Sequence, residues 1–155
     1  MASPVFRSIL VPHDFSSEAD DALRLAAQLA GPSTTLTVLH VIEPYVGPSD
    51  ITFATLVPPP QSLVPDQRRE LEARVRKLLR NGAGPVKVQV VVGSPASEIV
   101  RAAAKASLVV MATMGRTGLA HLLIGSVAEK VVRHSPTPVL TTRPRRRRAA
   151  KRARR

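Results

Sequence analysis

The feature that most constrains this chain is the alternation of two hydrophobic periodicities along its 155 residues. Short apolar, β-branched runs alternate with longer segments whose apolar residues recur every three or four positions. The runs predict strands at 8–12, 34–42, 86–92, 107–111 and 137–142. The segments between them predict helices that start near Ser16, Pro65, Ser94 and Ser126. Strands that alternate with helices in this way favour an α/β fold, with a mostly parallel sheet and helices on both faces.

The composition supports that fold class and excludes several functions. Apolar residues make up 44% of the chain and aromatic residues only 3%, which favours helices packed on a β-branched sheet over an all-β sandwich. The runs at 9–11, 86–92 and 108–111 scarcely alternate with polar residues, so we interpret them as strands buried on both faces. There is no cysteine, which excludes disulfides, thiolate zinc sites and cysteine catalysis.

One irregular stretch, residues 43–64, interrupts the alternation. It contains five prolines, at 44, 48, 58, 59 and 60, which exclude a regular helix or a central strand there. Loops of this length in a compact domain are usually functional or mobile. We expect it either to cover a binding site or to contact another subunit.

Open parallel sheets bind ligands beyond the carboxyl ends of their strands. The segment that leaves the predicted fourth strand at Met111 carries glycines and reaches a helix start at Gly125 and Ser126. Helix starts offer unpaired N–H groups and a positive dipole, and glycines let the backbone approach a ligand, so the segment suits a phosphate or another anion. The alternative is that the glycines only form turns and that Ser126 caps the helix, since Ser126 and Glu129 have capping-box spacing.

With these residues in view, the chain resembles the universal stress proteins over nearly all of residues 6–143. Residues 9–16 look like that family's first strand and turn, 39–41 like its second strand, and 92–95 like the turn after its third. Gly115, a spacer of nine residues, and Gly125-Ser126 match the pattern G-x2-G-x9-G-[S/T] of ATP-binding members, with Ala112 in place of the first glycine. The resemblance implies a single-domain, five-stranded parallel sheet of order 3-2-1-4-5. It also implies homodimers, which we expect to form through the last strand.

The resemblance also implies a site for ATP, residue by residue. The expected residues lie beside the adenine and ribose, in the wall of the site and at the phosphates. They are Pro12, His13, Asp14, Val41, Met111, Ala112, Gly115, Arg116, Gly125, Ser126 and Val127. Asp14 is either a ligand contact or a helix-capping carboxylate, and Arg116 is either a phosphate partner or a solvated loop residue. Ala112 costs little unless the backbone there needs a positive φ.

The expected activity is binding and regulation in a stress response, with slow ATP hydrolysis at most. The P-loop, dinucleotide and nucleophile-elbow motifs are absent, and no acid and base are paired. The four histidines lack metal-ligand spacing, so we expect no metal held by protein side chains, although Mg²⁺ carried by the nucleotide phosphates is compatible.

The charge of the chain is concentrated at its end. The net charge is +12, and nine Arg and Lys residues with no acid follow from Arg143 onward, which leaves +3 on residues 1–142. We therefore expect a folded domain at 1–143 and a disordered basic tail at 144–155. The tail suggests an alternative function: a dimeric scaffold that has lost strong ATP binding and contacts nucleic acid or another polyanion.

No apolar run is long enough for a membrane helix, and we expect a cytoplasmic protein without membrane contact.

Overall fold

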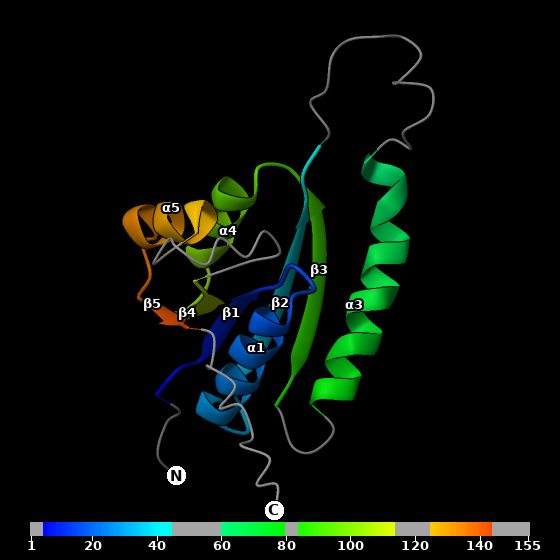
Figure 1. Cartoon of the computed structure of the whole chain (residues 1–155). Helices are drawn as coiled ribbons and strands as arrows, with labels where there is room; N and C mark the ends of the chain where they lie inside the picture. The colour runs from blue at the N-terminus through cyan, green and yellow to red at the C-terminus, as the bar shows by residue number, and fades with distance from the viewer. Residues whose placement is uncertain (1–4, 45–59, 80–83, 114–124, 144–155) are drawn as a thin grey trace, which may run out of the picture.

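The computed structural model describes residues 5–44, 60–79, 84–113 and 125–143, which form one sheet with helices on both faces (Figure 1). The basic tail at 144–155 and residues 45–59 of the proline-rich stretch lie outside the described residues. In chain order the elements are β1 (Ser8–Pro12), α1 (Ser17–Leu29), β2 (Thr35–Ile42), the 3-10 helix η1 (Pro60–Leu63), α3 (Val64–Leu78), β3 (Val86–Val92), α4 (Pro95–Ala103), β4 (Leu108–Ala112), α5 (Ser126–His134) and β5 (Val139–Thr142).

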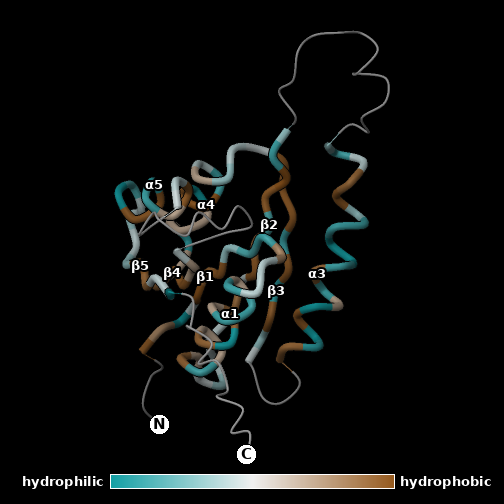
Figure 2. The backbone as a smooth tube through the Cα atoms, in the orientation of Figure 1, coloured by the Kyte–Doolittle hydropathy of each residue, from teal (hydrophilic) through white to brown (hydrophobic). Residues whose placement is uncertain are grey.

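The sheet has five parallel strands in the order β3-β2-β1-β4-β5, as predicted. Alternate side chains of the strands form two separate cores. Ile9 and Val11 of β1 pack toward α1 and α3, whereas Leu10 packs toward α4 and α5. Figure 2 shows hydrophobic residues concentrated along the strands. The double burial predicted for β1 and β4 is confirmed, since four of the five residues in each are buried.

The prediction that 86–92 is buried on both faces is wrong. β3 is an edge strand, and none of its seven residues is fully buried. The run does alternate at its start: Val88 and Val90 pack toward α3, whereas Lys87 and Gln89 lie on the opposite face. β-branched residues suit a half-covered edge as well as a central strand, so the valines alone did not distinguish the two.

The helix starts differ in how they are capped. Ser16 caps α1, and its hydroxyl accepts a hydrogen bond from the Ala19 N–H at 3.1 Å. The capping box predicted at Ser126 and Glu129 is wrong, because Gly125 occupies the N-cap position and Ser126 is the first helical residue. Glu129 instead pairs with Arg133, one turn further along the helix, at 2.8 Å.

Within the described ranges, no helix is both long enough and apolar enough to cross a membrane.

Candidate functional site

A cavity of about 370 Å³ lies at the carboxyl ends of β1, β2 and β4, between the turn after β1 and the start of α5. Nine of the eleven expected site residues line it: Pro12, His13, Asp14, Val41, Met111, Ala112, Gly125, Ser126 and Val127. The other two, Gly115 and Arg116, lie outside the described residues. The cavity is therefore at the edge where an open parallel sheet binds its ligands.

The cavity has further lining residues that are not in the set implied by the resemblance, namely His40, Glu43, Pro95, Ile99 and Thr113. Pro95 and Ile99 come from the first turns of α4, which begins at the same edge of the sheet. The sequence signals near them were the Ser94-Pro95 helix start and the likeness of residues 92–95 to the turn after the family's third strand. Together with Val41 and Met111, Ile99 gives the cavity an apolar wall.

The α5 end of the cavity presents backbone donors. The Gly125 N–H donates to the Thr113 carbonyl at 2.6 Å, and the first N–H bonded within α5 is that of Glu129, which donates to the Gly125 carbonyl at 2.9 Å. The N–H groups of the three residues between them, 126–128, meet no acceptor among the described residues. Three N–H donors that meet no acceptor among the described residues, at the positive end of a helix dipole, would favour an anion here.

The Thr113 bond also explains why residue 125 is glycine. Its φ is −73°, which any residue adopts, but a Cβ at this position would lie 3.1 Å from the Thr113 carbonyl oxygen. Thr113 is held in turn by Thr142 of β5, whose carbonyl accepts from the Thr113 N–H at 2.9 Å and from its hydroxyl at 3.1 Å. The missing Cβ therefore makes room for a contact within the protein and keeps the start of α5 close to the sheet.

Ala112, which stands where the family pattern has glycine, is not strained. It is the last residue of β4 and pairs with Thr142. Among the described non-glycine residues, only Phe15 has a positive φ. The backbone at residue 112 therefore does not require glycine, and its methyl group is a small part of the cavity wall.

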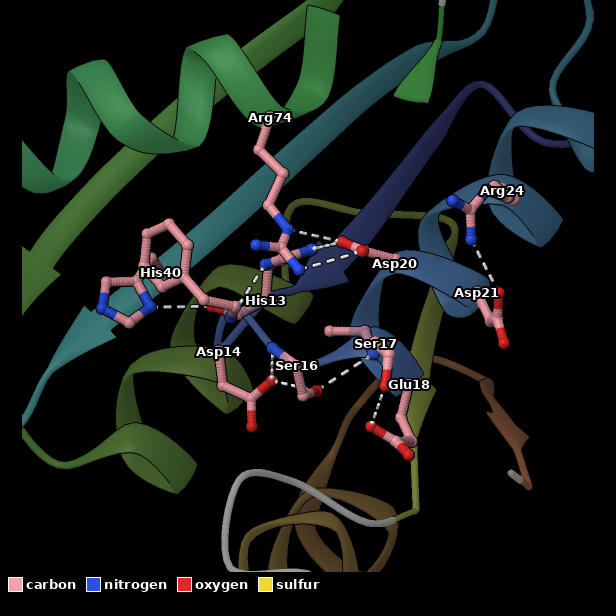
Figure 3. Close-up of polar contacts among 12 residues, drawn as sticks. His13, Asp14, Ser16, Ser17, Glu18, Asp20, Asp21, Arg24, His40 and Arg74 are labelled. Carbon is pink, nitrogen blue, oxygen red and sulfur yellow. Dashed lines mark hydrogen bonds and ion pairs between the residues drawn. The ribbon is translucent and has the colours of Figure 1, made fainter. Parts of the chain in front are cut away.

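The opposite end of the cavity is the turn after β1, which is held by side chains (Figure 3). One carboxylate oxygen of Asp14 accepts from the Ser16 N–H at 3.1 Å and from the Ser16 hydroxyl. Ser16 is itself the cap of α1. Of the two expected roles for Asp14, the capping role is thus indirect: Asp14 orients the serine that caps the helix, and it lines the cavity as well.

The His13 side chain is fully buried and engaged at both ring nitrogens. Nδ1 accepts from the Phe15 N–H at 3.1 Å, so the ring proton is on Nε2 and is donated to Asp20 at 3.1 Å. Arg74 of α3 donates two hydrogen bonds to the Asp20 carboxylate, at 2.7 and 2.9 Å (Figure 3). His13 therefore belongs to a chain of contacts that ties β1, α1 and α3 together beneath the cavity.

Burial and the neighbouring charges determine the charge states of His13 and Asp20. Burial lowers the pKa of His13, and the nearby Asp20 carboxylate only partly opposes this effect. Burial would raise the pKa of Asp20, but its hydrogen bonds and charge interaction with Arg74 outweigh burial and leave the pKa lowered. His13 is thus neutral and Asp20 charged at neutral pH.

Phe15 adopts a backbone conformation that is rare for a residue with a side chain, with φ of 65°. Left-handed backbone costs about 1–2 kcal/mol in such residues. The Phe15 ring packs edge-on against His40, with centroids 4.7 Å apart, and against His13 at 5.8 Å. His40 also donates from Nδ1 to the His13 carbonyl at 2.7 Å, so the surrounding contacts hold the strained turn in place.

No cluster of three or more His, Asp or Glu side chains that could hold a metal ion occurs within the ranges that the structure describes.

Comparisons with known proteins agree with this fold. A sequence model of the universal stress protein family matches residues 6–143. Universal stress protein MJ0531 of Methanocaldococcus jannaschii is 30% identical over 145 residues, which cover 90% of this chain and 83% of that protein. Universal stress protein YxiE of Bacillus subtilis is 33% identical over 150 residues, which cover 90% of this chain and all of that protein.

Solved structures give the same result. The structure of hypothetical protein MJ0577 is 28% identical with a TM-score of 0.74, over 90% of this chain and 97% of that one. A universal stress protein solved in complex with cAMP is 28% identical with a TM-score of 0.61, over 89% and 97% of the two chains. The chain described here belongs to the universal stress protein family.

Proposed function

We propose that this protein binds an adenine nucleotide, ATP in particular, in the cavity between the β1 turn and α5, as a regulator in a stress response. One observation carries the proposal: an apolar-walled cavity ends at the first three N–H groups of α5, which have no acceptor among the described residues. A nucleotide has the same division, because its base is flat and largely apolar on both faces while its phosphates are anionic. The cAMP complex of a 28%-identical relative supports the class of ligand.

The residues divide between the two parts of the ligand. Val41 and Pro12 would pack beside the base, with Asp14 near the ribose. Met111 and Ala112 would form the wall beneath the ribose and phosphates. The backbone N–H groups at the start of α5 would bind the phosphates, as helix N-termini bind anions elsewhere. A magnesium ion would be held by the phosphates and water.

A negative charge introduced at the start of α5 tests the proposal without breaking the fold. Position 126 lies in the first turn of a helix, where a carboxylate is favourable, so Ser126→Asp should keep or slightly raise thermal stability. The same carboxylate would repel the phosphates. We expect titration calorimetry with Mg-ATP to show at least about a tenfold loss of affinity, equal to about 1.4 kcal/mol.

Ser126→Asn is the matched control, because it has nearly the same shape without the charge and should bind ATP almost normally. The basic tail attracts any polyphosphate, so tripolyphosphate is titrated in parallel and adenosine is used as a competitor without charge. If Ser126→Asp bound ATP as the unaltered protein does, the phosphates would not lie at α5, and the proposal would be wrong.

A further inference from the structure

β3 ends the strand order of the sheet, and no other described strand pairs with its outer edge. Leu36 of β2 donates to the Pro85 carbonyl at 2.8 Å, and Gly93 donates to the Ile42 carbonyl at 3.0 Å. With the parallel register, these bonds turn the backbone groups of residues 87, 89 and 91 toward β2. The N–H and C=O groups of the four alternate valines, Val86, Val88, Val90 and Val92, therefore point away from the sheet.

These outward groups have no hydrogen-bond partner in the part of the chain that the structure describes. An edge strand of seven residues with free backbone groups is a template for a further strand, and proteins usually protect such edges with charges, prolines or bulges. Lys87 is the one charged residue within β3, and its side chain lies on the face away from α3. The described residues thus leave the edge itself largely unprotected along its length.

Two grooves flank β3, one on each face of the sheet. One, of about 810 Å³, runs between β3 and α3, and the other, of about 450 Å³, lies between the strands and α4. Leu39 lines both the α4-side groove and the cavity at the carboxyl edge, and the two grooves share no other lining residue with that cavity. A strand added to β3 would place its alternate side chains toward these two grooves.

The charges that line the grooves select the kind of strand. Their two acids are already paired, Glu72 with Arg68 at 3.0 Å and Glu98 with Arg101. Arg76, Lys87 and Lys105 also line the grooves and have no acidic partner among the described residues. The surroundings of the edge are therefore positively charged on both faces.

We propose that the open edge of β3 binds an extended acidic peptide of another protein, which joins the sheet as a sixth strand. Its backbone would pair with the outward groups of the valines, and its carboxylates would lie near Lys87 and Lys105 on one face and Arg76 on the other. Backbone pairing supplies the affinity in this mode of recognition, and the flanking side chains supply the selectivity. The inference is independent of the proposed nucleotide site.

The test uses the full chain and a short synthetic peptide of alternating glutamate and valine. Amide hydrogen exchange is followed by NMR with and without the peptide. We expect the amides of Val88 and Val90, which point outward, to exchange at least about tenfold more slowly when the peptide is bound. The amides of Gln89 and Val91, already bonded to β2, serve as internal references.

Two controls separate strand addition from attraction to the basic tail. The first is the same peptide with N-methyl groups on alternate residues, which keeps the charge but removes the backbone donors on one edge. Two such peptides are made, one methylated at its odd-numbered residues and the other at its even-numbered residues. One of the two should fail to protect the valine amides. The second is a pair of double variants with equal change in net charge. Lys87→Glu with Lys105→Glu should weaken binding at least about tenfold, whereas Arg7→Glu with Lys130→Glu, exposed and away from β3, should not.

Three results would overturn the proposal. Peptide binding without slower exchange at Val88 and Val90 would place the peptide on the tail or elsewhere on the surface. Equal protection by both N-methylated peptides would exclude strand addition. Protection that appears without peptide and increases with protein concentration would show that a second copy of this chain, and not another protein, occupies the edge.

Discussion

The two ends of the cavity are built by different means. The β1 turn is held by side chains from three elements: His13, Asp20 of α1 and Arg74 of α3 form one chain of contacts, with Phe15 packed above it. The α5 end is held by one backbone bond, from Gly125 to Thr113, and leaves its first three N–H groups without an acceptor among the described residues. One end thus has its polar groups satisfied within the protein, and the other offers them to a ligand. Changes at the first end should cost stability, and changes at the second should cost binding.

The largest expected effect is a loss of stability from a change at the β1 turn, whose polar groups are satisfied within the protein. Asp20→Ala removes the acceptor of both His13 and Arg74 and leaves the buried imidazole N–H without its partner. We expect the free energy of unfolding to fall by about 2–3 kcal/mol, measured by urea denaturation. Asp21→Ala is a matched control one residue along α1. Among the described residues Asp21 pairs with Arg24 alone, at the surface, so its loss should cost under about 0.5 kcal/mol. Similar losses of stability for the two variants would contradict the view that the contacts of the β1 turn stabilise the fold.

The next effect is at the α5 end. Gly125→Val adds a branched side chain where even a Cβ would lie 3.1 Å from the Thr113 carbonyl oxygen. We expect the start of α5 to move away from Thr113, with a loss of about 1–2 kcal/mol in stability and a larger relative loss in ATP affinity. Denaturation and calorimetry on the same preparation measure both. Loss of stability with unchanged ATP affinity would remove this end from the binding site.

The third effect is a dependence of stability on pH, and it again concerns the β1 turn. The pKa of His13 is lowered in the folded protein, so below its ordinary value of 6.5 the unfolded chain binds more protons. The stability from neutral His13 is therefore present above pH 6.5 and is lost as the pH falls toward the folded-state pKa, by up to about 1.4 kcal/mol per pH unit. Asp20, whose pKa is also lowered, adds a further loss only below its ordinary value of 3.8.

Denaturation curves at pH 7.5, 6.5 and 5.5 measure the His13 contribution. His13→Gln keeps an N–H near Asp20 but cannot titrate, so its stability should vary less with pH over this range. His134→Gln is the control, because His134 is exposed at the end of α5. An unchanged pH dependence in His13→Gln would show that another group controls it.

The smallest effect is expected at Ala112. Ala112→Gly restores the family pattern, but the backbone at this position is already extended and unstrained. We expect ATP affinity to change less than about twofold, with a loss of about 0.5–1 kcal/mol in stability from the flexibility of glycine in a strand. A large gain in ATP affinity would instead mean that the methyl group obstructs the ligand.

The sequence predicted the fold better than it predicted the contacts of the site. Hydrophobic periodicity placed β1 and β3 at their observed bounds and the other strands within two residues, because burial on a sheet controls both the pattern and the structure. The pairing of Asp20 with Arg74 spans 54 positions and has no local signature. The left-handed backbone at Phe15 was equally invisible, because the usual signals for that conformation are Gly and Asn. Gly125 was recognised as important, but its contact with Thr113 depends on the fold.

The Thr113–Gly125 bond has a consequence for how this protein can change. Residues 113 and 125 are fastened to each other, to β5 through Thr142 and to α5 through its first turn. The bonds of these two residues therefore join the sheet to the start of α5. Where an inserted segment is flexible, doubling the length of the connection adds only about 0.6 kcal/mol of closure cost. Inserted sequences between 114 and 124 should therefore be tolerated by the scaffold, so that in this family member new specificity could arise there by insertion while the domain keeps its stability.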